Sequence, residues 1–147
     1  MKTTLKFLTV LAFTLFISLG ATAQKRNITL KELPAAAQTF LAKHFPNQAT
    51  SYIIEDKGYI NTDYKVMLTG GTEIEFDGKG NLDEADGNKK ALPVSILPKA
   101  IATYIAANYK GQEIEKFEKE KFGYKVEFLN DLELEFDNNG KFLRIDN

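Results

Sequence analysis

The sequence predicts an α+β fold made of two tandem α-β-β-β-β repeats, each an antiparallel sheet with one helix packed on one face. An internal match is the first observation behind this prediction. Residues 33–48 match residues 97–112, 64 positions later, and both stretches begin with a Leu-Pro pair. Residues 64–77 then match residues 124–137 at a spacing of 60. Because the matches keep one order throughout, we interpret the chain as a duplicated unit.

Each unit is expected to begin with a helix. Pro34 and Pro98 suit a first helical turn, where a missing N–H group costs nothing. Apolar residues then recur at helical spacing, namely Ala37, Phe40, Leu41 and Phe45 in one unit and Ile101, Tyr104, Ile105 and Tyr109 in the other. Pro46 and Gly111 are expected to end the two helices.

Strands are expected after each helix. The first lies near residues 51–56 in one unit and 113–119 in the other. A hairpin follows in each unit, with turns at Gly70-Gly71 and at Asn130-Asp131, and a short last strand ends near Asp86 or Asp146. Alternation of period two directs one sheet face to the helix and the other to water. The polar run 81–92 is expected to link the units, and the pattern leaves open whether their sheets join.

The N-terminal residues 1–23 predict a signal peptide. Lys2 and Lys6 precede an apolar run of about 13 residues, which is shorter than the roughly 20 that a membrane-spanning helix needs. Ala21-Thr22-Ala23 then forms a cleavage pattern of small residues. We therefore expect an exported protein, periplasmic or secreted, with no membrane span after cleavage, and repeats at residues 24–86 and 87–147.

The composition excludes several classes of function. The chain of 147 residues has no Cys, no Trp and one His, and its formal net charge is −1. Disulfide frameworks, cysteine nucleophiles and thiolate metal sites are therefore absent, and the charge argues against nucleic-acid binding. Beyond the predicted signal peptide, Ser51 and Ser95 lack the context of a nucleophile elbow, and His44 is a lone histidine. We therefore predict that the protein is not an enzyme and that it binds no cofactor.

These repeats resemble the PepSY-like family of exported bacterial proteins, which is also described as beta-lactamase-inhibitor-like. The resemblance rests on the Leu-Pro pair, the aromatic helix, Tyr-Lys-Val at 64–66 and 124–126, and Glu-x-Glu-Phe-Asp at 73–77, matched by Glu133–Asp137. It covers essentially the whole chain after the signal peptide. The resemblance implies tandem α/β repeats whose sheets present a surface to a partner, and it transfers no catalytic residues.

The largest group of candidate functional residues is a ladder of charged side chains on the solvent-exposed face of the predicted sheets. The predicted contact surface consists of Tyr59, Lys65, Glu73, Glu75, Lys125, Glu133 and Glu135. Tyr59 is included because an aromatic residue in an irregular loop can anchor a partner. A solvated face with cross-strand ion pairs is the simplest alternative. Paired carboxylates could also hydrolyse a glycan.

A hard cation such as Ca²⁺ is a further candidate, because it takes six to eight oxygen ligands. Carboxylates at positions i and i+2 lie about 6.5–7 Å apart on a strand, which is too far to chelate one ion without another strand. The loop at Asp77–Asp83 lacks the pattern of a calcium loop, because Lys79 and Leu82 occupy key positions. No metal site is therefore predicted.

The sequence predicts an exported, non-enzymatic binding module. Its expected partner is a protein of the cell envelope or extracellular space, which it binds and could inhibit through the charged face. A periplasmic protein that binds or senses a small ligand or Ca²⁺ is the alternative.

Overall fold

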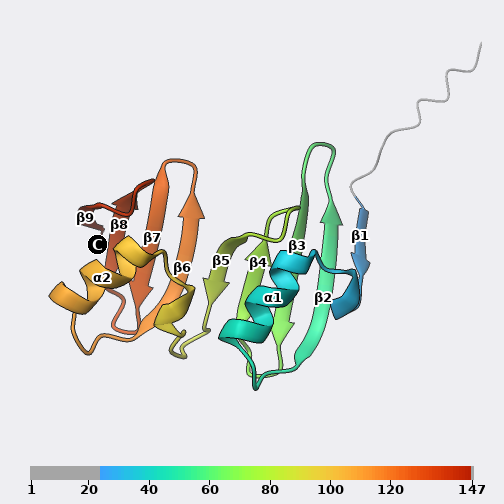
Figure 1. Cartoon of the computed structure of the whole chain (residues 1–147), viewed down its shortest axis with the longest axis horizontal. Coiled ribbons are helices and arrows are strands. Elements are labelled where there is room, and N and C mark those ends of the chain that lie inside the picture. Colours follow the sequence, from blue (N-terminus) through green and yellow to red (C-terminus); the bar gives the residue numbers. More distant parts are fainter. Residues whose placement is uncertain (1–23, 147) are drawn as a thin grey trace, which may run out of the picture.

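The computed structural model describes residues 24–146 and forms one nine-stranded sheet with two helices (Figure 1). The predicted signal peptide, residues 1–23, lies outside the described residues. The strands are β1 (Gln24–Asn27), β2 (Thr50–Lys57), β3 (Thr62–Leu68), β4 (Glu73–Phe76), β5 (Leu82–Asp86), β6 (Ile114–Glu120), β7 (Gly123–Phe128), β8 (Glu133–Asp137) and β9 (Phe142–Asp146). They lie in chain order, and every neighbouring pair is antiparallel. The α+β class is therefore confirmed.

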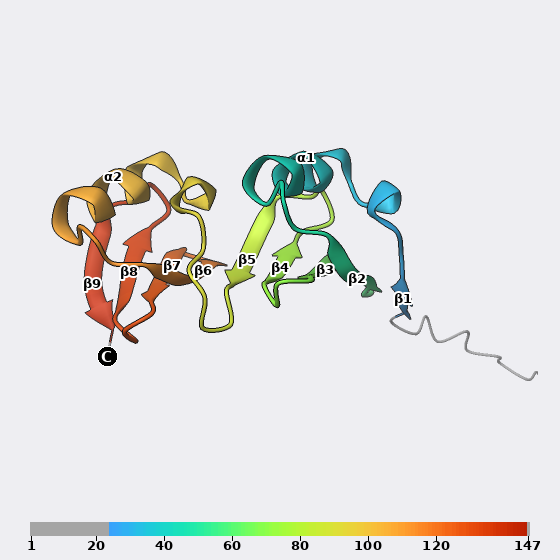
Figure 2. The ribbon, with the colours of Figure 1, turned by 90° about the horizontal axis from the view of Figure 1, so that it is seen from below.

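Two α-helices and two short 3₁₀ helices cover one face of this sheet, and Figure 2 shows both α-helices on the same side. They are η1 (Leu30–Glu32), α1 (Ala35–His44), η2 (Val94–Ile96) and α2 (Lys99–Asn108). Both α-helices begin directly after their predicted proline and end one residue before an aromatic cap, Phe45 or Tyr109. No helix among the described residues is long and apolar enough to cross a membrane.

The core lies between the helices and the sheet. Alternate strand residues such as Val66, Ile74 and Phe76 are fully buried against α1, and Val126, Leu134 and Phe136 are buried in the same way under α2. Edge-to-face contacts join Phe40 to Phe76 and Tyr104 to Phe136, with ring centroids 5.4 and 5.6 Å apart. The predicted alternation therefore directs the apolar residues toward the helices.

The matched glycines Gly80 and Gly140 sit in tight turns beneath the start of each helix. Their φ angles are +84° and +76°, which favours glycine. A Cβ atom on Gly80 would lie 2.8 Å from the Ala37 nitrogen, and one on Gly140 would lie 2.9 Å from the Ala100 Cβ. Packing against the helix thus explains why glycine occurs at both positions.

The sequence left open whether the two sheets join, and the structure shows that they form one sheet. We call residues 24–86 the first unit and residues 87–146 the second unit. Strands β5 and β6 pair in register, with Glu84 opposite Glu118, Ala85 opposite Phe117 and Asp86 opposite Lys116. We call this pairing the seam. It makes the sheet continuous, because the backbone groups along β5 find partners on β6.

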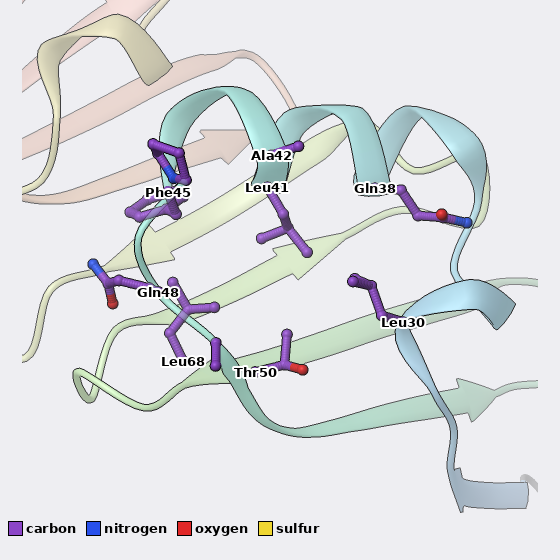
Figure 3. A pocket seen from close by; sticks show the side chains of 10 residues that line it. Leu30, Gln38, Leu41, Ala42, Phe45, Gln48, Thr50 and Leu68 are labelled. Carbon is purple, nitrogen blue, oxygen red and sulfur yellow. The ribbon is translucent and has the colours of Figure 1, made fainter.

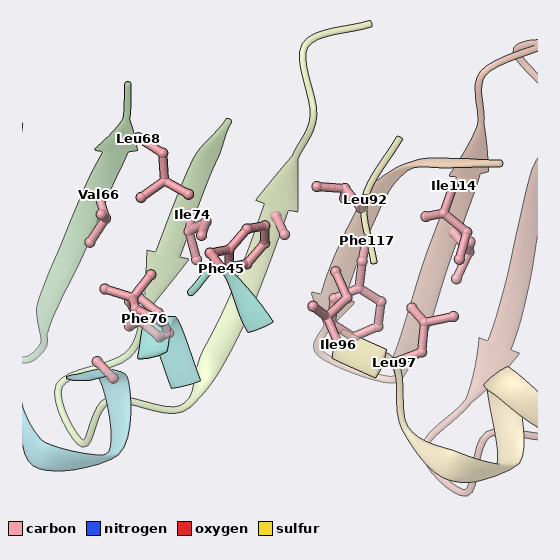
Figure 4. Packing of buried hydrophobic residues seen from close by; sticks show 14 of the residues in the cluster. Phe45, Val66, Leu68, Ile74, Phe76, Leu92, Ile96, Leu97, Ile114 and Phe117 are labelled. Atoms are coloured by element: carbon pink, nitrogen blue, oxygen red, sulfur yellow. The ribbon is translucent and has the colours of Figure 1, made fainter. Parts of the chain in front are cut away.

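The seam has an apolar core of its own. Figure 4 shows Leu92, Ile96, Leu97, Ile114 and Phe117 gathered beside the first unit's core, and Phe117 is only 2% exposed. Because β5 occupies Leu82–Asp86, the predicted linker at 81–92 is wrong in its first half. The link is the short loop after Asp86, held by hydrogen bonds from the Gly87 nitrogen to the Glu115 oxygen (2.8 Å) and from the Leu92 nitrogen to the Ile114 oxygen (2.7 Å).

Strand β1 was not predicted, because its residues Gln24–Asn27 show no apolar alternation. It pairs with β2, and an ion pair between Arg26 and the buried Glu55 fastens it there. Arg26 also lies 3.0 Å from Glu32 of η1. Electrostatic pairing in this strand takes the place of apolar burial.

Candidate functional site

The face opposite the helices carries two rows of charged side chains that cross the sheet in register. The inner row runs Lys65, Glu75, Glu84, Glu118, Lys125, Glu135 and Arg144. The outer row runs Glu73, Asp86, Lys116, Glu127, Glu133 and Asp146. We call these residues the charged face. Carboxylates outnumber basic groups on it, so the face is acidic and suits a partner with basic groups.

Lys65 is held between two carboxylates in the first unit. Its Nζ atom lies 2.7 Å from Glu73 Oε1 and 2.7 Å from Glu75 Oε1. Hydrogen bonds to Glu73 and then Glu75 raise the pKa of Lys65 above its ordinary value. The side chains of Lys65 and Glu73 are 40% and 27% exposed, so this cluster is open to a partner.

Lys125 occupies the corresponding place in the second unit but has different neighbours. Its Nζ atom lies 2.8 Å from Glu133 Oε1 and 3.7 Å from Asp146 Oδ2. Glu135 instead pairs with Arg144, at 2.9 Å from its guanidinium. The hydrogen bond to Glu133 raises the pKa of Lys125. The predicted ladder is therefore present in both units, with Arg144 as an added cation in the second.

The seam contains a third lysine that pairs with two carboxylates, and the sequence analysis did not include it in the contact surface. Lys116 Nζ lies 2.8 Å from Glu84 Oε1 and 3.7 Å from Glu118 Oε2. Burial lowers the pKa of Lys116, but the hydrogen bond to Glu84 and the charges of Glu118 and Asp86 outweigh it, so the pKa is raised. The sequence predicted a strand near residues 113–119, which includes Lys116, but only the pairing of β5 with β6 brings Glu84 to it.

Glu127 faces a small pocket on the charged face. The pocket has a volume of about 100 Å³ and is lined by Lys116, Glu118, Lys125, Glu127 and Glu133. Burial raises the pKa of Glu127, and the charges of Glu115 and Glu133 raise it further. The Glu127 carboxyl therefore gives up its proton less readily than a solvated glutamate.

Tyr59 lies apart from the other predicted contact residues. It is 74% exposed in the β2–β3 turn, beside Ile60, which is 94% exposed. That turn is closed by a hydrogen bond from the Gly58 nitrogen to the Asn61 oxygen (2.8 Å). The structure thus brings six of the predicted residues onto one face and leaves Tyr59 at the end of the sheet.

The acidic turns do not gather ligands for a metal. Asp77 Oδ1 accepts hydrogen bonds from the Lys79 and Asn81 nitrogens, at 2.8 and 2.9 Å, and Asp137 makes the same contacts with Asn139 and Lys141. Within residues 24–146, no group of three or more His, Asp or Glu side chains is arranged to hold a metal ion.

His44 and Ser95, which the sequence analysis took separately, are hydrogen-bonded. His44 Nδ1 lies 2.8 Å from Ser95 Oγ, joining α1 to η2. Burial, with a smaller effect of Lys43, lowers the pKa of His44. Among the described residues no carboxylate contacts the other ring nitrogen, so the pair lacks the third member of a catalytic triad.

Two apolar pockets, which the sequence did not predict, lie on the face of the sheet that the helices cover. One, of about 400 Å³, lies beside α1 and is lined in part by Leu30, Leu41, Phe45 and Leu68 (Figure 3). The other, of about 320 Å³, lies beside α2 at the matching positions Val94, Ile105 and Tyr109, among others. Similar pockets therefore lie on the helix face of both units, away from the charged face.

Comparison with models of known protein families finds one family that matches this chain. The family model described as "Putative beta-lactamase-inhibitor-like, PepSY-like" matches residues 62–144, from β3 to β9. The chain belongs to this family. The resemblance inferred from the sequence is thereby confirmed for this PepSY-like protein, and comparison with curated proteins gives no match.

Solved structures of similar proteins cover the described part of the chain. A "putative periplasmic protein" of the DUF2874 family from Bacteroides vulgatus has 34% identity and a TM-score of 0.78, over 84% of this chain and 98% of its own. A "putative calcium-regulated periplasmic protein" from Bacteroides thetaiotaomicron has 33% identity and a TM-score of 0.77, over 84% and 97%.

A third structure, a "putative periplasmic protein of unknown function" from Bacteroides vulgatus, has 35% identity and a TM-score of 0.76, over 84% of this chain and 100% of its own. All three are described as periplasmic. This PepSY-like protein is accordingly exported, to the periplasm or beyond.

Proposed function

We propose that this PepSY-like protein is a non-enzymatic binding module that docks on an envelope protein through its charged face. The continuous acidic face across both units is the observation that carries the proposal. Side chains on it are already ordered by ion pairs, so a partner's basic groups would meet pre-organised carboxylates. Such a face mainly accelerates association and makes it dependent on salt.

The proposed contact centres are the lysine clusters of the two units. Lys65, Glu73 and Glu75 form one, and Lys125, Glu133 and Glu135 form the other. In each, a carboxylate remains partly exposed while paired, as with Glu75 at 37%. A partner with arginines could share these carboxylates, because a carboxylate offers about four acceptor positions.

We further infer that the two units are copies of one ancestral repeat and that this gives the partner two similar docking points. The helices begin after prolines with nearly the same backbone angles, φ −52° and ψ 143° or 141°. Both units then place a lysine beside the first carboxylate of the Glu-x-Glu pair. Two linked contacts would strengthen binding beyond either one alone.

Affinity capture tests the proposal. The protein would be immobilised and exposed to envelope extract from its own source, alongside the variant Glu75→Lys/Glu135→Lys. A matched control, Thr103→Lys/Ala107→Lys/Glu113→Lys, adds the same charge at exposed residues away from the charged face. We expect one stoichiometric protein on the wild type and the control but not on the face variant. Equal capture by all three would refute the role of the face.

Tyr59 is tested separately, because it lies outside the charged face. If the β2–β3 turn anchors the partner, Tyr59→Ser weakens capture while leaving the melting temperature unchanged. Phe122→Ser, which alters an equally exposed aromatic residue in the β6–β7 turn, is the matched control. Unchanged capture with Tyr59→Ser would remove this residue from the proposed surface.

Cation binding is the second candidate, favoured by the calcium-regulated description of a similar protein. In this chain, Asp63, Asp77 and Asp83 line one surface pocket of about 420 Å³, which is the place to test for a cation. Burial raises the pKa of Asp63, as do the charges of Asp83 and Asp56. If Ca²⁺ binds there, calorimetry gives a heat of binding that Asp63→Asn abolishes. No heat and no change of melting temperature with millimolar Ca²⁺ would reject this candidate.

A further inference from the structure

The two edges of the sheet differ in chemistry. At one edge, β1 presents only exposed polar residues, including Lys25 and Arg26. At the other, β9 exposes two large apolar side chains, Leu143 (55%) and Ile145 (44%). A short edge strand made only of polar and charged residues, such as β1, resists pairing with other chains, whereas β9 also carries exposed apolar side chains that pairing could cover. The β9 edge is therefore the one suited to add a strand.

The first unit shows how the corresponding edge is covered. Ile145 lies opposite Leu134 as Ala85 lies opposite Ile74, so β9 holds the place in the second unit that β5 holds in the first. Ala85 is fully buried and pairs with Phe117 across the seam. Among the described residues, nothing pairs with the outer edge of β9. Its exposed Ile145 thus marks the position of a missing neighbour strand.

The sequence of β9 indicates which strand would pair with its free edge. Arg144 and Asp146 flank Ile145 on the charged side of the sheet. An antiparallel strand of identical sequence, centred on Ile145, would place Arg144 opposite the partner's Asp146 and Asp146 opposite the partner's Arg144. The two Ile145 side chains would meet on the helix side. We propose that β9 pairs with β9 of a second copy, giving a two-fold symmetric dimer with one continuous sheet.

Arg144 and Asp146 remain exposed enough in the monomer to contact a second copy. The Arg144 side chain pairs with Glu135 at 2.9 Å yet remains 66% exposed. Asp146 lies 3.7 Å from Lys125 and is 45% exposed. A guanidinium has five donors, so Arg144 can bind the partner's Asp146 without releasing Glu135. The dimer would use Arg144 and Asp146 at the edge of the charged face, whereas the proposed contact centres for the envelope partner are the lysine clusters around Lys65 and Lys125.

A disulfide trap tests this register directly. Directly opposed residues of antiparallel strands have Cα atoms about 4.5–5.5 Å apart, which fits the 4.4–6.8 Å span of a disulfide. The chain contains no cysteine, so Ile145→Cys introduces a single thiol. Under mild oxidation we expect most Ile145→Cys protein to become a covalent dimer. Ile60→Cys, at a 94% exposed position, is the control. Equal yields from the two variants would overturn the proposal.

Charge substitutions test the pairing without a crosslink. Arg144→Asp and Asp146→Arg each place like charges opposite each other in a homodimer, so each should weaken self-association at least tenfold in sedimentation equilibrium. Mixing the two variants restores opposite charges at both positions and should restore the dimer. Melting temperatures verify that each variant is folded. A wild-type protein that stays monomeric to ~1 mM, forms open-ended oligomers, or is not restored by mixing contradicts the proposal.

Discussion

Lys116 Nζ on β6 lies 2.8 Å from Glu84 Oε1 on β5, so an ion pair spans the seam between the two units. The same lysine approaches Glu118, which lies directly opposite Glu84 in the strand register. Lys116 therefore separates two like charges that would otherwise face each other.

Removing this lysine should weaken the seam. Lys116→Met keeps the aliphatic stem but leaves Glu84 and Glu118 facing each other, and like charges directly opposed on strands cost about 0.2–1 kcal/mol. We expect a loss of that size in the free energy of unfolding, measured with urea. Glu118→Gln added to Lys116→Met should recover part of it. Lys79→Met, in an exposed turn, is the control, and an equal loss there would contradict this role of Lys116.

Phe117 should matter far more than an exposed phenylalanine of the same hairpin. It is 2% exposed and packs at the seam, whereas Phe122 is 74% exposed. Truncating a buried phenylalanine to alanine costs about 3–5 kcal/mol. Phe117→Ala should therefore lower the unfolding free energy by several kcal/mol and Phe122→Ala by less than about 0.5 kcal/mol. Similar losses would mean that the seam is not a packed core.

The turn glycines provide a test of helix–turn packing. Gly80→Ala combines an unfavourable positive φ with a collision at the start of α1, so we expect a loss of about 2–3 kcal/mol. Gly111 also has a positive φ, +85°, but a Cβ there would meet nothing within 4 Å. Gly111→Ala should cost only about 1 kcal/mol. Equal destabilisation of the two variants in thermal melts would argue against the packing explanation.

Glu127 should make stability depend on pH. Burial and the charges of Glu115 and Glu133 raise the pKa of Glu127, so the folded state binds its proton more readily than the unfolded state. This carboxyl therefore costs stability once the pH exceeds its unfolded pKa, about 4.3, and costs nothing well below that value. Glu127→Gln should raise the melting temperature at pH 7 and leave it unchanged near pH 3. A gain that persists at low pH would exclude the electrostatic cause.

The local elements were predictable from the sequence, because their signals are local. Alternation located β3, β4 and β8, the internal match located β7, and the prolines marked the starts of α1 and α2. The charged ladder around Lys65 and Lys125 followed from the same alternation. Strand β1 was missed because ion pairs such as Arg26–Glu55, rather than apolar burial, hold it in place.

The long-range relationships were not predictable. Pairing of β5 with β6 depends on which strand edges meet, and a single sequence does not encode this as a periodic signal. Lys116 was therefore missed as part of the charged face, although it lies on a predicted strand. The hydrogen bond between His44 and Ser95 was missed for the same reason, since it joins residues 51 positions apart.

Carboxyl footprinting of the captured complex is the most direct test of the charged face. A carbodiimide and a small amine label exposed carboxylates, and mass spectrometry locates the label with and without the bound partner. We predict that Glu73, Glu75, Glu133 and Glu135 lose labelling in the complex while Glu113, which lies outside the charged face, keeps it. Unchanged labelling of these four residues in a saturated complex would show that the partner binds elsewhere and would contradict the proposed function of this face.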